Sequence, residues 1–245
     1  MVLFHNNYLY YMINSNWFLS LIIFFVTANL LAQDTLNNSA VDSLYREDQF
    51  YIGINYNIIT SVPNGVSTSG LSGGLQFGFL RDIPLNKRRN IAVAIGAGFA
   101  FDQYGENLFI GEDVSEKSIF TILNNTDYTY DRNRFSTAII ELPIEFRWRT
   151  STPESYRFWR IYSGFRFGYA YYYKATLIQP NNNINQTDIP EFDPVRLRAT
   201  LSFGNSKINF FGSYSINPFF KNVVTTNGSS VDFRSIKLGL IFYIL

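Results

Sequence analysis

Two carboxylates and several arginines alternate with apolar residues in the middle of the chain, and they are the residues best suited to chemistry. Glu141 and Glu145 lie four residues apart in the segment 138–149, which also contains Arg147 and Arg149. A pair of carboxylates can serve as acid and base, as in glycoside hydrolysis. The neighbouring guanidinium groups favour the ionised form of both, so neither is suited to be a general acid. These residue types are instead typical of ion pairs, because arginine binds carboxylates through two parallel hydrogen bonds.

Cysteine and histidine, two residue types that often act in catalysis and metal binding, are nearly absent. The chain has no cysteine, and its single histidine is His5. Disulfides and thiolate metal sites are therefore excluded. No histidine remains as a catalytic base after residue 5. The formal net charge of +1 gives no support for nucleic-acid binding. We expect no enzymatic activity, no cofactor and no nucleic-acid partner.

Long β-strands are the elements that must position these charges. In residues 138–149 and 159–173, apolar residues alternate with polar, charged or small ones, and a period of two is typical of a strand. Six other segments alternate in the same way. The eight predicted strands are 50–59, 71–80, 91–101, 138–149, 159–173, 195–203, 208–216 and 235–245.

Strand number, connector length and composition indicate the fold class. Eight strands of about ten residues match the smallest outer-membrane barrels, which have short periplasmic turns and longer extracellular loops. The long, polar connectors are 60–70, 102–135, 174–194 and 217–234, whereas 81–90, 150–158 and 204–207 are shorter. The sequence therefore predicts an all-β, eight-stranded antiparallel transmembrane β-barrel. A small hairpin is expected in the longest loop. The alternative is a soluble barrel or sandwich, because alternation alone does not tell which face is inside.

The amino-terminal region contains the longest apolar run, residues 17–31. This run has the length of the apolar part of a secretory signal peptide, and Ala32 precedes a plausible cleavage point. The predicted organisation is a signal peptide at 1–32, a periplasmic lead-in at 33–48 and a barrel at 49–245. An uncleaved membrane anchor is the alternative for 17–31. The predicted location is the outer membrane of a Gram-negative bacterium.

The charged faces of the strands are expected to point into the lumen. Strand 91–101 supplies only alanine and glycine to that face, so long arginine side chains could cross toward it. We interpret the set as a charge-paired plug, because eight strands enclose just enough space for their own side chains. The alternative is an anion path or gate. The predicted lumen network is Glu141, Glu145, Arg147, Arg160, Arg166, Arg196, Arg198 and Lys237, with Arg149 near the mouth.

Aromatic residues gather near the predicted strand ends, where membrane interfaces favour them. The expected interface residues are Trp148, Tyr156 and Trp159 on the periplasmic side, and Tyr169, Tyr171 and Tyr173 on the outer side. The last strand also has a polar-x-Gly-x-x-apolar-x-apolar spacing, formed by Lys237, Gly239, Phe242 and Ile244. This spacing resembles the insertion signal that the barrel assembly machinery reads. Outer-membrane lipids and that machinery are therefore expected partners.

Segments 139–149 and 158–162, together with 239–245, resemble the PorT-type, porin-like outer-membrane β-barrel family of Bacteroidota. The resemblance covers about 49–245 and implies an eight-stranded barrel without catalysis. PorT itself is implicated in type IX secretion and gliding, so secretion or gliding proteins are implied partners. The expected function is a structural or interaction component of the cell envelope. The alternatives are a narrow passive channel for small solutes and a loop-based adhesin or ligand binder.

Overall fold

Strands make up nearly all regular structure in the computed structural model, which describes residues 48–124, 129–150, 159–205 and 207–244. No helix in these ranges is long and apolar enough to cross a membrane. The strands are β1 (Gln49–Thr60), β2 (Gly73–Pro84), β3 (Ile91–Gly105), β4 (Leu108–Glu112), β5 (Ser118–Ile122), β6 (Arg132–Arg149), β7 (Trp159–Gln179), β8 (Asn182–Gln186), β9 (Val195–Asn205), β10 (Ile208–Ser215) and β11 (Arg234–Ile244).

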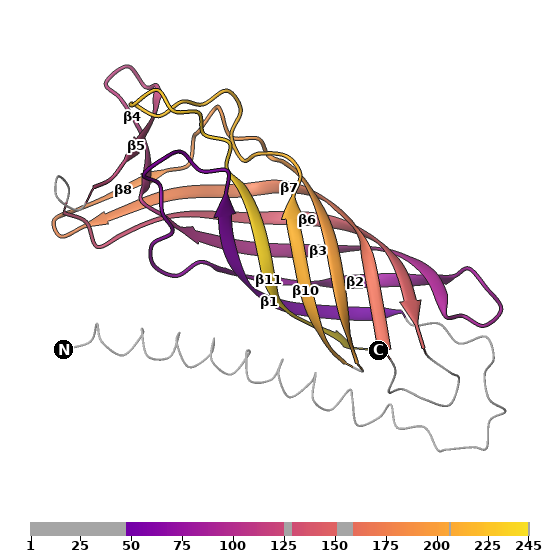
Figure 1. Cartoon of the computed structure of the whole chain (residues 1–245). Coiled ribbons are helices and arrows are strands. Elements are labelled where there is room, and N and C mark those ends of the chain that lie inside the picture. Colours follow the sequence, from indigo (N-terminus) through magenta and orange to yellow (C-terminus); the bar gives the residue numbers. More distant parts are fainter. Residues whose placement is uncertain (1–47, 125–128, 151–158, 206, 245) are drawn as a thin grey trace, which may run out of the picture. The chain divides into compact units, whose positions relative to one another are not determined.

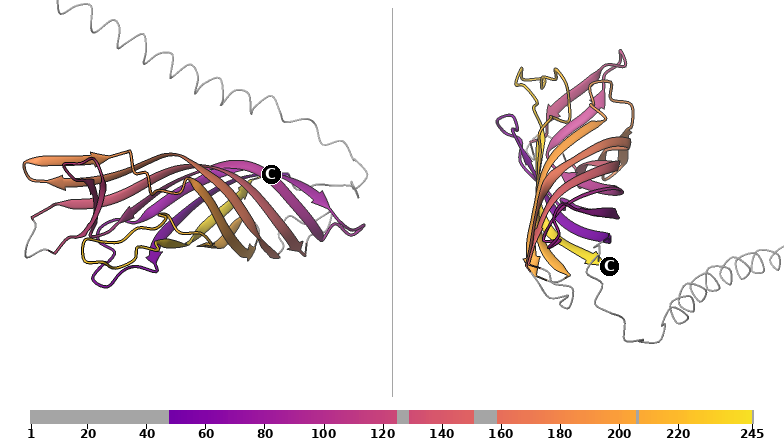
Figure 2. Two further views of the ribbon diagram at one scale, coloured as in Figure 1. Left: turned by 90° about the horizontal axis from the view of Figure 1, so that it is seen from above. Right: turned by 90° about the vertical axis from the view of Figure 1, so that its right-hand side faces the viewer.

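Eight of these strands form a closed antiparallel barrel (Figure 1). The order around the wall is β1, β2, β3, β6, β7, β9, β10 and β11, and the pairing of β11 with β1 closes it. Each predicted strand corresponds to one of them, so the predicted fold class is confirmed. The tilt of the strands is visible from two further sides in Figure 2. We call the end with the β2–β3 and β9–β10 connections the turn end, and the opposite end the loop end.

Side chains alternate between the two faces of the wall. In β1, Phe50 is 60% exposed on the outside, whereas Tyr51 is fully buried inside. Along the other strands, large apolar side chains are also exposed outside, and polar, charged or small residues point inward. The polar face is therefore the inner one. The alternative of a soluble barrel with its apolar face buried is wrong for the described strands.

Several strands are longer than their apolar alternation predicts. β2 continues to Pro84 and β3 to Gly105, so Asp82 and Asp102 belong to the barrel wall and not to the connectors. β7 extends beyond the barrel at the loop end, where it pairs with β8. The expected hairpin in the longest loop is present as β4 and β5. Consequently the loop end is more ordered than the connector lengths alone suggest.

The pairing of β6 with β7 contains one irregularity. Ala138 pairs with Tyr172 and Ile139 pairs with Ala170, so Tyr171 is an extra residue on β7. Such a β-bulge leaves one residue unpaired and bends the strand. It also exchanges the two faces of β7 for the residues that follow.

This bulge corrects one prediction. Tyr173 was expected to share the outward face of Tyr169 and Tyr171. Tyr173 is instead only partly exposed and packs against the loop residue Phe192, with 4.2 Å between ring centroids. Strict alternation along β7 cannot anticipate an inserted residue, so the prediction for Tyr173 as an interface aromatic is wrong.

A cluster of buried apolar residues fills the loop end of the barrel. It joins inward residues of the strands to residues of the long connectors, and we call it the apolar cap. At its centre Phe135 contacts Phe192, Phe219 and Phe220, with ring centroids 5.5 to 6.1 Å apart. The cap consists of Ala100, Tyr104, Leu108, Ile110, Phe120, Phe135, Ile139, Ala170, Ala175, Ile189, Phe192, Phe219, Phe220, Val223, Val231 and Phe233.

Inward glycines of β2 and β3 make room for a tyrosine of β1. A Cβ added to Gly98 would lie 2.1 Å from the Tyr51 hydroxyl oxygen and 2.7 Å from the Phe77 carbonyl oxygen. We expect Gly98→Ala to lower the free energy of unfolding by about 1–3 kcal/mol, as overpacking does. Tyr51→Phe should recover part of this loss, because it removes the nearer contact. Urea unfolding in lipid vesicles measures both, and identical losses with and without Tyr51→Phe would contradict the contact.

Candidate functional site

The predicted network residues all lie inside the barrel. They come from four strands, β6, β7, β9 and β11, and each is at most 4% exposed. These residues are Glu141, Glu145, Arg147, Arg160, Arg166, Arg196, Arg198 and Lys237. Arg149, expected near the mouth, is fully buried as well. Charged groups in such a place require partners, because an unpaired buried charge is very costly.

At the turn end, one aspartate accepts hydrogen bonds from two arginines. The two carboxylate oxygens of Asp82 accept hydrogen bonds from Arg149 Nη1 and Nη2 at 3.0 and 2.9 Å. Arg147 Nη1 donates to the same carboxylate at 3.1 Å. All three side chains are fully buried. Asp82 therefore links strand β2 to β6 across the interior of the barrel.

The middle of the lumen contains both predicted glutamates. Arg147 donates through Nε and Nη2 to Glu145 Oε2, at 3.2 and 3.1 Å. Arg166 Nη2 lies 4.0 Å from Glu145 Oε1, and its Nη1 donates to Glu141 Oε2 at 3.1 Å. Arg198 pairs with the other oxygen of Glu141. The two glutamates thus lie between arginines from three strands.

Toward the loop end, the pairing continues through Asp102. Arg198 Nη1 lies 4.0 Å from Asp102 Oδ2, and Lys237 Nζ donates to the same oxygen at 2.5 Å. Asn57 Nδ2 donates to the other oxygen at 3.2 Å. Cations and anions therefore alternate without interruption. We call this series the ion-pair chain: Arg149, Asp82, Arg147, Glu145, Arg166, Glu141, Arg198, Asp102 and Lys237.

Two predicted network residues lie toward the ends of the lumen. Arg196 is at the loop end, where its Nη2 donates to the Pro218 carbonyl oxygen at 2.6 Å and lies 3.8 Å from Asp193. Its guanidinium group also lies over the Phe219 ring, 4.7 Å from the centroid. Arg160 is buried at the start of β7, opposite Arg149 of β6. The predicted set therefore divides between the middle and the two ends of the lumen.

Aromatic rings occupy the space beside the arginines. The Arg147 guanidinium lies 4.7 Å from the Tyr162 ring centroid and 5.9 Å from that of Tyr243. Arg166 lies over Tyr51, at 4.9 Å, and Arg166 Nη1 donates to Gln76 Oε1 at 2.7 Å. A guanidinium over an aromatic face is attracted by the ring. Arg166 crosses from β7 to Tyr51 of β1 and Gln76 of β2. The small residues of strand 91–101, toward which the arginines were predicted to cross, do not make these contacts.

Sequence reasoning missed both aspartates of the ion-pair chain. It placed Asp82 and Asp102 in connectors, and it assigned only alanine and glycine to the inward face of the third strand. Asp102 corrects that assignment. The sequence did contain a signal for both aspartates, because every second residue of a strand points to the same side. Asp82 continues the inward series of Gln76 and Gly78, and Asp102 continues the inward series that includes Gly98. The apolar outward residues become sparse there, so the apolar pattern ends before the strand does.

The geometry gives these groups little scope for catalysis. Glu141 and Glu145 each form a buried ion pair with arginine, so their carboxylate oxygens are already occupied by guanidinium donors. Among the described residues, no group of three or more His, Cys, Asp or Glu side chains is arranged to hold a metal ion. The arrangement instead cross-links opposite strands and fills the lumen.

Beside the apolar cap, a carboxyl group has a different environment. Glu106 follows β3 and is 1% exposed, and its Oε2 has no hydrogen-bond partner in the described part of the chain. Burial raises the pKa of Glu106 well above the ordinary value of 4.5. In the folded protein Glu106 therefore resists ionisation, whereas in the unfolded chain its carboxyl group ionises above the ordinary pKa of 4.5. The contribution of Glu106 to stability is therefore fully present below pH 4.5 and is lost as the pH rises through its raised folded-state pKa.

We expect hydrogen exchange of the β4–β5 amides, corrected for the intrinsic rate, to show increasing opening as the pH rises above 4.5. The variant Glu106→Gln should show a flat profile over this range, because glutamine does not ionise. The same slope in both proteins would assign the effect to another group.

The predicted interface aromatics and the C-terminal spacing are placed as follows. On the outer face, Trp148, Trp159, Tyr169 and Tyr171 are 39%, 58%, 56% and 49% exposed. Tyr156 lies outside the described residues, as do the predicted signal peptide and all of the lead-in except Asp48. In β11, Lys237 and Gly239 point inward, whereas Phe242 and Ile244 point outward.

Comparison with known proteins agrees with this architecture. Residues 31–223 match a family described as "Outer membrane protein beta-barrel domain". A comparison with curated proteins gives no match. The closed barrel, its exposed apolar wall and this match place the protein in the outer membrane. Short turns are typical of the periplasmic side of such barrels. The chain belongs to the outer membrane protein β-barrel domain family.

Proposed function

We propose that the protein is a non-enzymatic structural and interaction component of the outer membrane, with a lumen closed to solutes. The observation that carries this proposal is the ion-pair chain, which joins β2, β3, β6, β7, β9 and β11 across the interior. The apolar cap fills the loop end of the same lumen. A water-filled channel needs an interior free of such side chains. Contacts with other molecules are therefore made by the outer surface, the loops and the turns.

The loop end offers a structured surface for a partner. The β4–β5 hairpin contains exposed side chains, and Val114 at its tip is fully exposed. Its base is anchored by packing of Leu108, Ile110 and Phe120 in the apolar cap. A rigid anchor reduces the entropy cost of binding. This surface also favours a second candidate function, that of a loop-based adhesin or ligand binder.

A more specific proposal is that the protein is a component of a secretion or gliding machine. It is supported by the resemblance of segments 139–149, 158–162 and 239–245 to the PorT-type family of Bacteroidota. The residues of that resemblance include Glu141, Glu145 and Arg147 of the ion-pair chain. The resemblance therefore supports a barrel interior like that of the PorT-type family more directly than it supports the same partner proteins.

Affinity purification from native outer membranes in mild detergent tests the interaction role. The matched control is a variant in which a short glycine-serine turn replaces residues 108–122, with folding checked by heat-modifiability on a gel. We expect envelope proteins to co-purify in fixed proportion with the wild type and to be lost with the control. Secretion or gliding components among them would support the finer proposal. Purification of the folded wild type without any proportionate partner would contradict the interaction role.

A further inference from the structure

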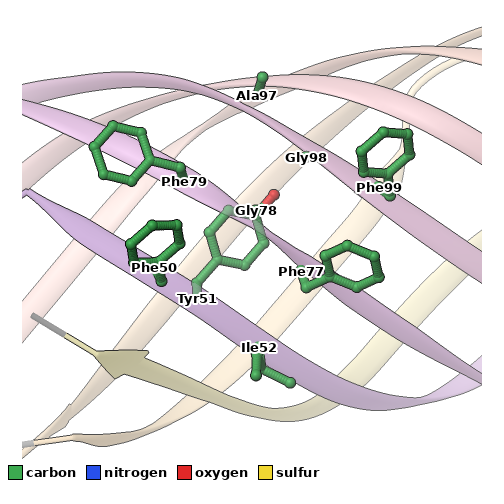
Figure 3. Close-up of a pocket in the computed structure, with 9 residues that line it drawn as sticks. All are labelled: Phe50, Tyr51, Ile52, Phe77, Gly78, Phe79, Ala97, Gly98 and Phe99. Atoms are coloured by element: carbon green, nitrogen blue, oxygen red, sulfur yellow. The ribbon is translucent and has the colours of Figure 1, made fainter. Parts of the chain in front are cut away.

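The outward face of β1, β2 and β3 contains an apolar groove of about 530 Å³ (Figure 3). Its walls are aromatic: the rings of Phe50 and Phe79 lie 5.1 Å apart, and those of Phe77 and Phe99 lie 5.7 Å apart. Between them lies Ala97, whose small side chain leaves the surface hollow. We call this the β1–β3 groove.

The floor of the groove owes its depth to the inward glycines. Gly78 and Gly98 have no side chain, and the Tyr51 ring lies behind them on the lumen side. The lining is therefore apolar carbon on the walls and thin backbone at the floor. In a membrane-spanning wall, such a hollow must be filled by a lipid chain or by another apolar surface.

Basic residues lie at the periplasmic end of the same strands. Arg81 follows Phe79 by two residues, so it lies on the same outward face, nearer the turn. Its side chain is 53% exposed and forms an ion pair of 2.9 Å with Asp48. Lys87 and Arg88 are exposed in the β2–β3 turn, and residues 83–101 contain no acidic residue. A positive charge thus lies at headgroup level below an apolar groove.

A second outward groove provides the contrast. It lies over β6, β7 and β9 and has a volume of about 450 Å³, with Phe146, Phe165 and Ala199 in its lining. Between this groove and the turn end, the described strand residues, Trp148 and Ile161 among them, include no outward lysine or arginine. The β9–β10 turn contains one exposed lysine, Lys207. Among the described residues, the β1–β3 groove therefore has more basic side chains at its turn end than the second groove has.

We propose that the β1–β3 groove binds an anionic phospholipid of the periplasmic leaflet. One acyl chain lies between the phenylalanine rings, and the phosphate lies at Arg81, Lys87 and Arg88. Lysine and arginine near a membrane surface attract anionic lipids, and aromatic rings pack well at the headgroup boundary. A second copy of the chain is disfavoured on this face. Two copies inserted in the same direction and related by a twofold axis would bring their basic turns together at the same depth.

Native mass spectrometry of the protein released from detergent micelles tests this proposal. Dioleoyl-phosphatidylglycerol and dioleoyl-phosphatidylcholine are the probes, because they share acyl chains and differ in net charge. We expect one phosphatidylglycerol to bind about tenfold more tightly than phosphatidylcholine. The triple variant R81Q/K87Q/R88Q should lose this preference. Ala97→Phe, which fills the groove, should lose the bound lipid, whereas Ala199→Phe in the second groove should keep it.

Three results would overturn the proposal. Equal binding of the two lipids would show that the basic residues do not select an anionic headgroup. Equal retention of lipid by Ala97→Phe and Ala199→Phe would place the lipid elsewhere. A dimer that the wild type forms and Ala97→Phe abolishes would assign the groove to a second copy. Heat-modifiability of each variant shows that the barrel is folded, so loss of lipid cannot be due to loss of the fold.

Discussion

Glu145→Ala is expected to lower the free energy of unfolding by about 3–5 kcal/mol, the cost of breaking a buried ion pair by removing one partner. Glu145 accepts two hydrogen bonds from Arg147 and lies 4.0 Å from Arg166, and all three side chains are buried. Its removal leaves the two arginines buried with less anionic charge beside them. Urea unfolding in lipid vesicles and heat-modifiability on a gel measure the loss.

The matched control for this experiment is an exposed ion pair. Asp232 lies 3.4 Å from Arg234, and the two side chains are 47% and 29% exposed. Asp232→Ala should cost no more than about 1 kcal/mol, because solvent screens the pair. An equal, small loss for Glu145→Ala and Asp232→Ala would contradict a desolvated lumen network.

Asp102→Leu should be about as damaging as Glu145→Ala, and a second substitution should repair it. Lys237 is 1% exposed and donates to Asp102 at 2.5 Å, so the single variant leaves a buried ammonium group without this partner. We expect a loss of about 3–5 kcal/mol. In the double variant Asp102→Leu/Lys237→Met, apolar side chains replace both charges, and most of the stability should return.

The double-mutant cycle distinguishes an ion pair from general packing. Asp102 also lies 4.0 Å from Arg198 and accepts a hydrogen bond from Asn57, so the recovery should be incomplete. A coupling energy of about 1 kcal/mol or more between the two positions indicates a direct interaction. Additive losses in the double variant would show that Asp102 and Lys237 do not stabilise each other.

Much of the barrel could be predicted from the sequence, because a period of two decides which residues share a face. The alternation in β6 and β7 correctly gave the positions of Glu141, Glu145 and Arg166 on one face. It could not tell which face was inside, since a soluble barrel has the same period. The closed pairing of β1 with β11 and the exposure of the apolar face answer that question.

The remaining errors have local physical causes. Asp82 and Asp102 were placed in connectors because outward apolar residues become sparse near strand ends, although backbone pairing continues there. The prediction for Tyr173 is wrong because the bulge at Tyr171 inserts one residue into β7, and a regular alternation of residues does not indicate such an insertion. Partner choice within the ion-pair chain depends on which strands face each other across the lumen. That arrangement follows from closure of the barrel and not from any single strand.

Planar-bilayer conductance of the purified, heat-modifiable protein shows whether the lumen is closed to ions. We expect the current to stay at the baseline of the bare bilayer, because the ion-pair chain and the apolar cap fill the lumen. A known porin, reconstituted in the same way, shows that insertion is detected. Stable open levels that appear with the wild-type protein and scale with the amount inserted would contradict a closed barrel.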